Sequence, residues 1–414
     1  HFYRSTEKFE KLHYIINSMQ IESEESLRSR AASNVSILIE ESIMLDTNAE
    51  DETPTFDPQE CHPGCELGTG GFSIVYQVDS ITLNNRQPQD DRVNGRDYLA
   101  MNTLKNEHAR YAIKTLKNAM IKKATSINEE DRLQFIAGVA DLAMEAKYLS
   151  VLSHPHIIKM RGMASVHPCS DSFFIVLDRL YDTLQERIDD AWTKKARKFS
   201  GGLGFVLDSN GSKKDKFAAN RFCVAHDISS VLAYLHSQRI VFRDLKPDNV
   251  GFDVRGQVKV FDFGLTREMV STSEEASGSD SDVYVMSGDV GSLRYMAPEV
   301  AKSEAYNHKA DIYAFGLVLW QICTLKTPYK ELDANNFHEV VIEGGERPKI
   351  DEKTAPAPVV RLIERCWSSD LKDRPESNEI MNVLRAEIGA YDETMLGELD
   401  VSDRTQMSAN ANSE

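Results

Sequence analysis

Two short segments contain the polar side chains that are best suited to chemistry. Residues 242–249 read FRDLKPDN and residues 261–264 read FDFG, so a carboxylate, a lysine and a carboxamide fall within six positions, and a second carboxylate follows 13 residues after the carboxamide. Phosphoryl transfer needs a group that orients the attacking hydroxyl and hard oxygen ligands for Mg²⁺. Asp244 suits the first role, and Asn249 and Asp262 suit the second. Each residue type also forms turns for local reasons, but the ordered set favours the chemistry.

A glycine-rich segment offers a place for phosphate groups. Residues 68–75 read GTGGFSIV. Glycines in a turn between two strands allow backbone amides to close on a phosphate chain, although Gly-x-Gly alone fits many β-turns. Because the segment leads into a strand and not into a helix, it argues against a dinucleotide-binding fold.

A lysine and a glutamate form a candidate ion pair. Lys114 ends an apolar strand that contains Ala112, and Glu145 lies on the helical face that also carries Leu142 and Leu149. A buried ammonium needs an anion, since an unpaired interior charge is costly. Paired with Glu145, Lys114 would direct its ammonium at ATP phosphates. The alternative is that both are ordinary solvent-exposed charges.

A sheet followed by helices would position these residues. Strands are expected over residues 66–79 (with the glycine turn between them), 110–114, 157–160 and 173–177, and an amphipathic helix over residues 130–153. Later, helices are expected over residues 217–237 and 310–324, with short strands at 250–252 and 258–261. Strands first and helices afterwards predict an α+β fold with a sheet-rich lobe and a helical lobe.

Composition changes suggest the domain boundaries. An acidic, mostly disordered extension is expected over residues 1–58, although the apolar run from Val35 to Leu45 would allow a docked helix. The main domain would cover residues 59–388, with one lobe over 59–177 and the other over 181–388. Polar inserts are expected over residues 80–109 and 192–216, and a disordered tail over 389–414.

Over roughly residues 60 to 388, the chain resembles eukaryotic protein kinases, whose signature combines these segments in this order. The sequence APE at residues 297–299 follows FDFG, as it does in that family. The resemblance implies a bilobal kinase fold that binds ATP and Mg²⁺ and transfers the γ-phosphoryl group of ATP to a protein hydroxyl.

The resemblance also implies a role for each matching residue. Asp244 would be the catalytic base, Lys246 would contact the transferred phosphate, and Lys114 and Glu145 would form the phosphate-binding pair. Asn249 and Asp262 would bind the metal, with the backbone of residues 178–180 at the adenine edge. Together the expected ATP contacts are Gly68, Gly70, Phe72, Val75, Ala112, Lys114, Leu177, Asp178, Leu180, Asn249 and Asp262. Asp311 would brace the catalytic loop, which is the FRDLKPDN segment of residues 242–249, and Glu299 would pair with Arg374.

The acceptor class follows from the same resemblance. Lys246 stands two residues after Asp244, as in serine/threonine kinases, and Ser292 stands where that class keeps a hydroxyl near the substrate. DIYAFG at residues 311–316 is similar to the tyrosine-kinase-like group. The expected partner is a protein substrate with a serine or threonine acceptor, within intracellular signalling.

Regulation by phosphorylation is also implied. An arginine at the position of Arg243 commonly pairs, in this family, with a phosphate on the activation segment. Residues 265–296 contain many hydroxyl groups, and Ser287 is the expected site by spacing. A flexible segment with serines that serve only solubility is the alternative.

Three positions depart from the family pattern. Phe242 replaces the usual histidine, and its ring can pack under the phenyl ring of FDFG. Ser73 replaces the third glycine of the turn. Gly251 stands where the family places a bulky apolar residue beneath the adenine, which implies weaker binding of ATP.

These departures keep open the alternative that the chain is a pseudokinase that works as a binding scaffold. A small-molecule kinase is a third reading, against which the APE sequence counts.

Charge and cysteine content limit the other options. A formal net charge of −17 disfavours binding to nucleic acid. No stretch of about 18 apolar residues exists to span a membrane. Six scattered cysteines suggest a reducing compartment, cytoplasmic or nuclear. Cys61, His62 and Cys65 have the residue types of a zinc site but lack a second pair at the usual spacing. The chain begins with His1, which suggests a fragment or a processed chain. The oligomeric state is not indicated.

Overall fold

The computed structural model of the chain describes residues 24–40, 42, 45, 53–84, 91–126, 128–200, 212–269, 283, 284, 286, 291–350 and 353–391. These residues divide into two units. The N-terminal unit takes its described residues from Lys8–Arg179 together with Asp262–Thr266. The C-terminal unit takes them from Leu180–Phe261 and Arg267–Glu414.

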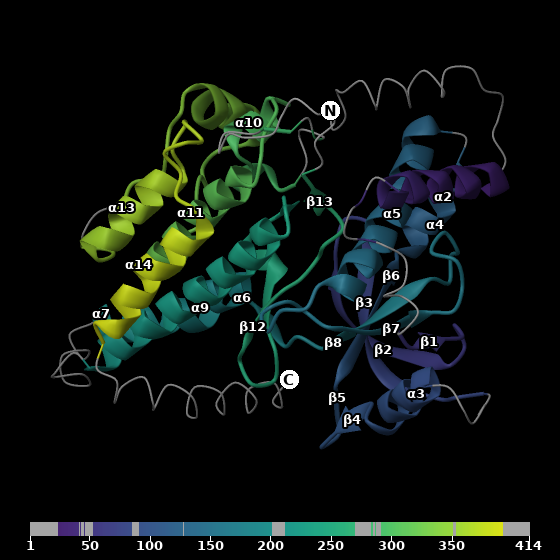
Figure 1. The fold of residues 1–414 in the computed structure, drawn as a ribbon. Coiled ribbons are helices and arrows are strands. Elements are labelled where there is room, and N and C mark those ends of the chain that lie inside the picture. Colours follow the sequence, from purple (N-terminus) through teal and green to yellow (C-terminus); the bar gives the residue numbers. More distant parts are fainter. Residues whose placement is uncertain are drawn as a thin grey trace. The chain divides into compact units, whose positions relative to one another are not determined.

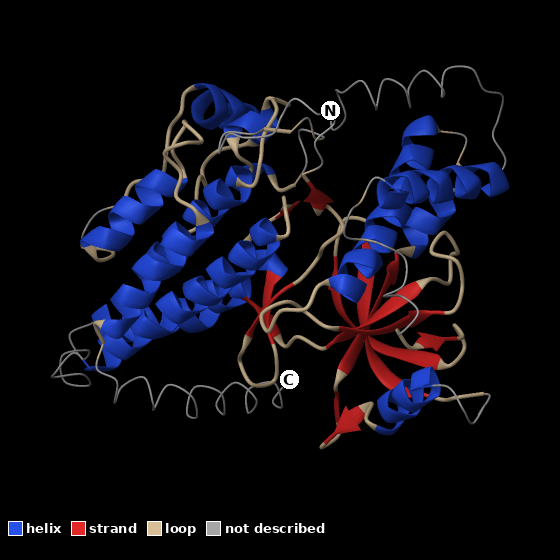
Figure 2. Cartoon of the chain, in the orientation of Figure 1, coloured by secondary structure: helices blue, strands red, loops and turns tan. Residues whose placement is uncertain are grey.

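A six-stranded sheet is the framework of the N-terminal unit (Figures 1 and 2). Neighbouring strands are antiparallel, except that β1 and β7 run parallel. In spatial order the strands are β1 (Thr55–Phe56), β7 (Met160–Ala164), β8 (Phe174–Asp178), β6 (Tyr111–Leu116), β3 (Ser73–Ile81) and β2 (Cys61–Thr69). The glycine turn joins β2 and β3, as the sequence predicts. Strand β1 was not among the expected strands.

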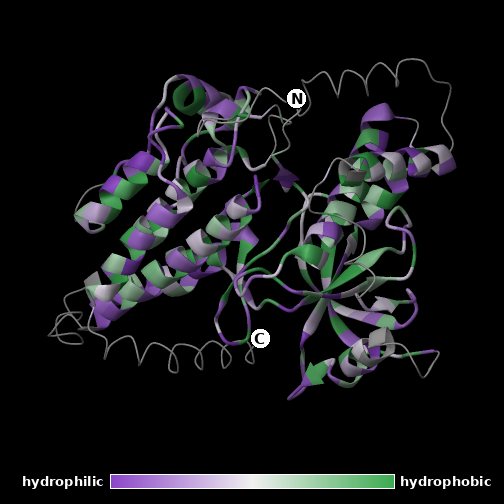
Figure 3. Ribbon diagram, in the orientation of Figure 1, coloured by the Kyte–Doolittle hydropathy of each residue, from purple (hydrophilic) through white to green (hydrophobic). Residues whose placement is uncertain are grey.

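Helix α5 (Glu129–Val151) is the main helix of this unit. The side chain of Asn128 caps its first turn by accepting a hydrogen bond from the Glu130 amide. The acidic residues of that turn stabilise the helix by their attraction to the positive end of its dipole. Apolar residues along α5 are buried, and Figure 3 shows hydrophobic residues along α5 and along the strands of the sheet. Helix α4 (Asn118–Lys123) precedes α5 in the chain.

Two regions of the N-terminal unit differ from the sequence prediction. The extension expected to be mostly disordered contains helix α2 (Glu24–Glu40), which packs against α5. The polar insert contains helix α3 (Asp91–Met101) and the hairpin of β4 (Leu104–Lys105) and β5 (His108–Ala109). The insert helix is anchored because Arg96 donates to both oxygens of the buried Glu60 carboxylate.

The C-terminal unit is mainly helical. Its helices are α6 (Leu184–Arg187), the π-helix η2 (Ile188–Trp192), α7 (Thr193–Ser200), α9 (Ser212–Ser237), the short 3₁₀ turns η3 (Pro247–Asn249) and η4 (Leu293–Tyr295), α10 (Pro298–Ala301), α11 (Lys309–Thr324), α12 (Ala334–Phe337), the π-helix η5 (His338–Glu343), α13 (Ala357–Cys366) and α14 (Ser377–Gly389). Helix α11 is the centre of this unit, since all but its last residue are buried. The expected insert over residues 192–216 contains α7 and the start of α9.

Short strands in the C-terminal unit support the catalytic segments. Strand β11 (Val250–Phe252) lies between β9 (Asp182–Thr183) and β12 (Val258–Val260), and β10 (Ile240–Val241) pairs with β13 (Arg267–Glu268). The predicted hairpin is therefore present at β11 and β12. None of the helices within the described ranges combines the length and apolarity that crossing a bilayer requires.

Candidate functional site

Cross-strand pairing places several of the predicted nucleotide contacts on one face of the sheet. Val75 pairs with Lys114 between β3 and β6, and Ala112 pairs with Leu177 between β6 and β8. Residues directly opposite each other in an antiparallel pair share a face, and so do alternate residues of one strand. Val75, Ala112, Lys114 and Leu177 therefore lie on the same face.

The side chain of Lys114 joins two carboxylates. Its ammonium lies 2.5 Å from a carboxylate oxygen of Glu145 on α5 and 2.8 Å from one of Asp262. Glu145 is almost completely buried, whereas 42% of the Asp262 side chain is exposed. The predicted Lys114–Glu145 ion pair is thus present, and Asp262 is the member of the group that solvent can reach.

Burial and charge act in opposite directions on this group. Burial alone would lower the pKa of Lys114, but the carboxylates of Asp262 and Glu145 outweigh it and raise that pKa above its usual range. Burial also raises the pKa of Glu145 to about 7, although the Lys114 ammonium opposes this rise. Lys114 is therefore a cation. Its ammonium favours the charged form of Glu145.

The FDFG segment is held in an unusual backbone conformation. Asp262 has a φ of 70°, a left-handed value that costs energy for a residue other than glycine and that clusters at functional sites. Gly264 lies against α5, since a Cβ atom there would approach the Cβ atom of Asp141 to 3.0 Å. Close contact with α5 on one side and the Lys114 ion pair on the other therefore fix the direction of the Asp262 carboxylate.

The glycine turn is closed by hydrogen bonds of its own backbone. The Gly70 amide donates to the Ser73 carbonyl at 2.9 Å, and the Lys117 amide donates to the Phe72 carbonyl at 3.0 Å. Lys117 also donates its ammonium to the Gly70 carbonyl. Phe72 lies against α5 near Gly138, where an added Cβ would come within 3.0 Å of the Phe72 Cβ. The structure thus places Phe72 beside the helix that carries Glu145.

The chain after β8 was predicted to hold the adenine edge through its backbone. Two of its amides are engaged within the N-terminal unit, since Asp178 donates to the Lys159 carbonyl and Arg179 donates to the Arg110 carbonyl. The Asp178 carboxylate accepts two hydrogen bonds from Arg161, at 2.7 and 2.8 Å. Binding of the adenine edge by this segment stays a prediction.

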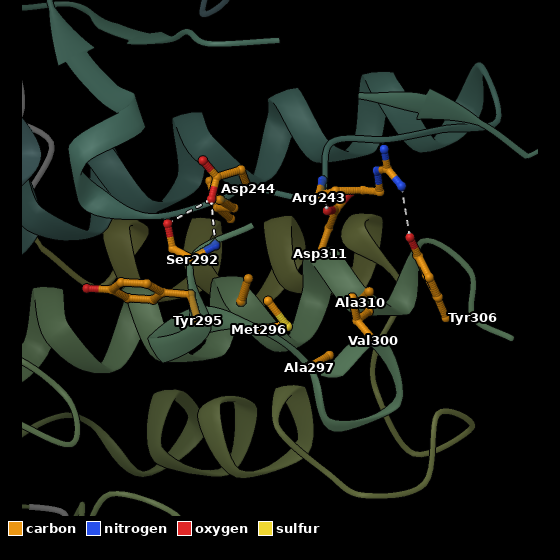
Figure 4. A pocket seen from close by; sticks show the side chains of 12 residues that line it. Arg243, Asp244, Ser292, Tyr295, Met296, Ala297, Val300, Tyr306, Ala310 and Asp311 are labelled. Atoms are coloured by element: carbon orange, nitrogen blue, oxygen red, sulfur yellow. Dashed lines mark hydrogen bonds between the residues drawn. The ribbon is translucent and has the colours of Figure 1, made fainter. Parts of the chain in front are cut away.

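Asp244 is the centre of the second group of predicted residues, in the C-terminal unit. One carboxylate oxygen accepts from the Lys246 ammonium at 2.7 Å and from the Asn249 amide at 2.8 Å. The other accepts from the Ser292 backbone amide at 3.0 Å and from the Ser292 hydroxyl at 2.9 Å (Figure 4). Lys246 also donates to the Ser292 hydroxyl at 2.7 Å. The four residues therefore form one hydrogen-bonded cluster around a largely buried carboxylate.

Gly291 allows Ser292 to approach Asp244. Its φ is +98°, and a Cβ at this position would lie 2.6 Å from the carbonyl oxygen of Arg243. A side chain would therefore be strained by the backbone conformation and would also collide with the catalytic loop. The glycine explains how the segment before Ser292 passes so close to the loop that carries Asp244.

Asp311 at the start of α11 holds the backbone of the catalytic loop. Its carboxylate accepts from the amides of Phe242 and Arg243, both at 2.8 Å. It also lies 2.9 Å from Nε2 of His236 on α9, whose Nδ1 lies 2.8 Å from the hydroxyl of Ser377. The bracing contact of Asp311 is as predicted, whereas the sequence reading missed His236.

His236 is expected to make unfolding pH-dependent. Burial lowers its pKa below the ordinary 6.5, against the raising effect of Asp311, while His308 lowers it and Glu376 raises it. An unfolded chain then binds the proton more readily, so the free energy of unfolding falls as the pH drops below about 6.5. Substituting His236→Gln should flatten this part of the stability profile, measured by urea unfolding between pH 5 and 7.5, a range chosen to bracket that value. An unchanged slope would contradict the assignment.

Gly251 on β11 makes room for Leu180. A Cβ atom at Gly251 would lie 2.5 Å from a δ-carbon of Leu180 and 3.2 Å from the Phe261 ring. Since Gly251 lies in a paired, buried strand, the need for glycine here comes from this close approach. The half-buried Leu180 side chain therefore occupies the space that a bulky residue at position 251 would take.

A paired substitution should reveal this exchange of side chains. We expect Gly251→Leu alone to destabilise the chain by about 1–3 kcal/mol through overpacking, and Leu180→Ala in the same chain to recover most of that loss. Thermal and urea unfolding of the two single variants and the double variant would measure the coupling. Strictly additive effects would show that the two side chains do not compete for one space.

Arg243 was predicted to receive an activating phosphate. Its φ is 71°, and its guanidinium donates to the Tyr306 hydroxyl at 3.1 Å (Figure 4). The pocket in Figure 4 is lined by residues 243–245, by five residues between Ser292 and Val300, by Tyr306, and by three residues at the start of α11. Ser287, the expected phosphorylation site, lies outside the described residues. Phosphate binding by Arg243 therefore stays a prediction.

A buried ion pair ties the APE segment to the end of the domain. Arg374 donates to both carboxylate oxygens of Glu299, at 2.6 and 2.9 Å, and its guanidinium lies 5.2 Å from the centre of the Tyr313 ring. Bidentate geometry of this kind is the strongest form of such a pair. The predicted Glu299–Arg374 contact is thus present.

The predicted site residues form two groups, each within one unit. Lys114, Glu145 and Asp262 meet in the N-terminal unit, and Asp244, Lys246, Asn249 and Ser292 meet in the C-terminal unit. Binding of one nucleotide by both groups stays a prediction. Phe242 and Phe263 are each fully buried, and their mutual packing stays a prediction as well. The first group joins three separate chain segments, and the contact of Asp262 with Lys114 is the part of it that the sequence did not predict.

Comparison with known proteins gives independent information. The family described as protein tyrosine and serine/threonine kinase matches residues 65–384. The chain is 38% identical over 183 residues to serine/threonine-protein kinase STY46 of Arabidopsis thaliana, a match that covers 44% of this chain and 30% of the relative. It is 37% identical over 170 residues to serine/threonine/tyrosine-protein kinase HT1 of Arabidopsis thaliana, covering 41% of this chain and 40% of the relative.

A third relative comes from an animal. Mitogen-activated protein kinase kinase kinase 7 of Bos taurus is 28% identical over 273 residues, which covers 65% of this chain and 39% of the relative. The matches thus span less than half the length of these three relatives. The family match spans most of the chain and includes both groups of site residues. The predicted α+β kinase fold is therefore confirmed, and the chain belongs to the protein tyrosine and serine/threonine kinase family, as a tyrosine-kinase-like member of the eukaryotic protein kinase superfamily.

Proposed function

We propose that the chain is an ATP-dependent protein kinase that transfers the γ-phosphoryl group of ATP to serine and threonine hydroxyls of protein substrates. The observation that carries this proposal is the Asp244 cluster, in which a carboxylate, an ammonium and a hydroxyl lie within hydrogen-bonding distance of one another. A substrate hydroxyl that takes the place of the Ser292 hydroxyl would donate its proton towards Asp244. Lys246 would lie beside the same oxygen.

Each group of residues has a distinct part in this reaction. Lys114, held by Glu145, would bind oxygens of the ATP phosphates, because a fixed ammonium stabilises the charge that develops there. The hydroxyl oxygen attacks the γ-phosphorus while the bond to the β-phosphate oxygen breaks, and ADP leaves. Asp244 orients the hydroxyl and accepts its proton. Lys246 would neutralise charge on the transferred group.

The donor set fits Mg²⁺. The Asn249 side-chain nitrogen donates to Asp244 twice, to its carbonyl and its carboxylate, which leaves the amide oxygen as the atom able to bind a metal. Asp262 contributes a partly exposed carboxylate. Hard oxygen ligands of these two kinds suit Mg²⁺, which would reduce the charge of the phosphates when bound. We propose these residues as the metal ligands.

The acceptor class rests on Lys246 and Ser292. Their hydrogen bond of 2.7 Å keeps a hydroxyl beside Asp244, and serine/threonine kinases carry these two residues at the same positions. STY46 carries the name serine/threonine-protein kinase, in support of this choice. HT1 carries the name serine/threonine/tyrosine-protein kinase, so phosphorylation of tyrosine is an outcome for the test to exclude.

Phosphorylation of a protein by the purified chain tests the proposal. The chain would be incubated with Mg·[γ-³²P]ATP and an unfolded basic protein, followed by phosphoamino-acid analysis. We expect label on serine and threonine, and loss of labelling when EDTA removes the metal. Label on tyrosine alone would contradict the acceptor class. An absence of labelling together with no thermal shift at millimolar Mg·ATP would favour a binding scaffold.

The cellular context is also a proposal. We infer that the chain acts in intracellular signalling, in the cytoplasm or nucleus, because its cysteines are scattered and those in the described residues are unpaired. The net charge of −17 supports a protein partner over nucleic acid. Fractionation of cells that express a tagged chain would test the location.

A further inference from the structure

Helix α2 packs against α5 in the N-terminal unit with one buried stripe (Figure 1). Leu27, Ala31 and Val35 are buried and are spaced four residues apart, so they lie on one face of the helix. Ser29 and Ser33 lie between them in the chain and are exposed. The pattern is that of a helix docked along one face.

Arg28 extends this contact to the connection between β7 and β8. Its guanidinium lies 5.6 Å from the centre of the Phe135 ring, which is fully buried on α5. The same guanidinium donates at 2.6 Å to the Cys169 carbonyl and at 2.6 Å to the Asp171 carboxylate. Cys169 and Asp171 belong to the connection between β7 and β8. Arg28 thus links α5 to the segment that leads into β8.

Both attachments belong to elements that are linked to the Lys114–Glu145 ion pair. Glu145 is a residue of α5, and Lys114 of β6 pairs with Ile175 of β8. Lys114 and Glu145 meet only if α5 keeps its distance from the sheet. A shift of about 1 Å in a catalytic group can lower the rate about 100-fold. The position of α5 is therefore a condition for a productive Lys114.

We propose that α2 is a positioning element of the kinase and that Arg28 is its positioning residue. By holding α5 against the β7–β8 connection, α2 keeps Glu145 within hydrogen-bonding distance of Lys114. Where it concerns turnover, this inference rests on the proposed function. It assigns to a segment before the matched kinase domain a part in forming the ATP-binding ion pair.

Three variants of the full chain test the proposal. Ala31→Glu places a carboxylate in the buried stripe, Arg28→Ala removes the link to Cys169 and Asp171, and Ser29→Glu adds the same charge on the exposed face as a matched control. Steady-state kinetics would give kcat and KM, hydrogen exchange would report on residues 129–151, and thermal unfolding would report the folded fraction. We expect kcat to fall about 10- to 100-fold for Ala31→Glu and by a smaller factor for Arg28→Ala, with an unchanged KM for the protein substrate.

Hydrogen exchange separates this proposal from the proposed function. We expect faster exchange of α5 amides in Ala31→Glu and wild-type exchange in Ser29→Glu, and this comparison holds even if the wild-type chain shows no phosphotransfer. The proposal is overturned if the α2 amides of Ala31→Glu lose protection while the protection of the α5 amides stays unchanged. It is also overturned if the α2 amides lose protection while turnover stays unchanged. A fall in kcat that merely equals the fall in folded fraction would also overturn it.

Discussion

Asp244→Asn is expected to lower kcat by about two to four decades, the usual contribution of a positioned acid–base group. Asparagine has nearly the same shape, but it cannot take the proton of the attacking hydroxyl. Its amide nitrogen, a donor, would also face the donors that now bind a carboxylate oxygen of Asp244. Lys246 and Ser292 would lose the carboxylate that organises them. Steady-state phosphotransfer to a protein substrate, with the affinity for Mg·ATP measured separately, would show the loss.

The same substitution at Asp248, four residues after Asp244, is the control for this experiment. Asp248 is exposed and lies between Lys246 and Asn249 in the chain. Asp248→Asn removes the same charge from the same loop, so we expect it to keep nearly wild-type turnover. If Asp244→Asn retained wild-type turnover in a purified assay, the assignment of Asp244 as the base would be wrong.

Lys114→Met is expected to lower kcat by about two to three decades, which is the typical cost of removing one preorganised electrostatic group. The variant would also leave the Glu145 and Asp262 carboxylates without their shared cation. Because Lys114 opposes the rise in the pKa of Glu145, its removal should raise that pKa further and favour the protonated acid. Kinetics at saturating ATP, together with a thermal-unfolding profile over pH, would measure both effects.

An exposed lysine of the same unit gives the comparison for Lys114. Lys122 lies on α4 with an exposed side chain, so Lys122→Met changes the net charge equally without touching the ion pair. We expect its turnover to stay close to wild type. Equal losses for the two variants would mean that Lys114 acts only through the overall charge of the chain.

The sequence predicted the chemistry better than it predicted the shape around it. Asp244, Lys246 and Asn249 lie within six positions, so their residue types and spacing alone suggested a cluster, and the structure forms it through direct hydrogen bonds. The Lys114–Glu145 pair could be proposed because a buried ammonium needs an anion and the next helix offers one. Asp262 joins this pair as well, a contact that no local pattern indicated.

Features that depend on distant packing were harder to predict. The prediction of a disordered extension considered only the apolar run from Val35 to Leu45 as a possible helix, whereas helix α2 buries Leu27, Ala31 and Val35. Helix α3 contains Asn-Gly, a turn signal, and it is anchored by Arg96 on the buried Glu60. The fit of Leu180 over Gly251 joins residues 71 positions apart. These contacts become visible only when the strands and helices are placed.

The hydrogen bonds at Asp244 have a consequence for the rate at which water hydrolyses bound ATP. Two donors already point at each of its carboxylate oxygens, which is about as many as a carboxylate accepts. A lone water molecule that enters beside it finds no vacant acceptor, and it lacks the binding contacts with which a protein side chain could displace the Ser292 hydroxyl. We therefore expect slow hydrolysis of ATP when no protein substrate is bound. ATP should be consumed mainly when a bound protein places a serine or threonine hydroxyl beside Asp244.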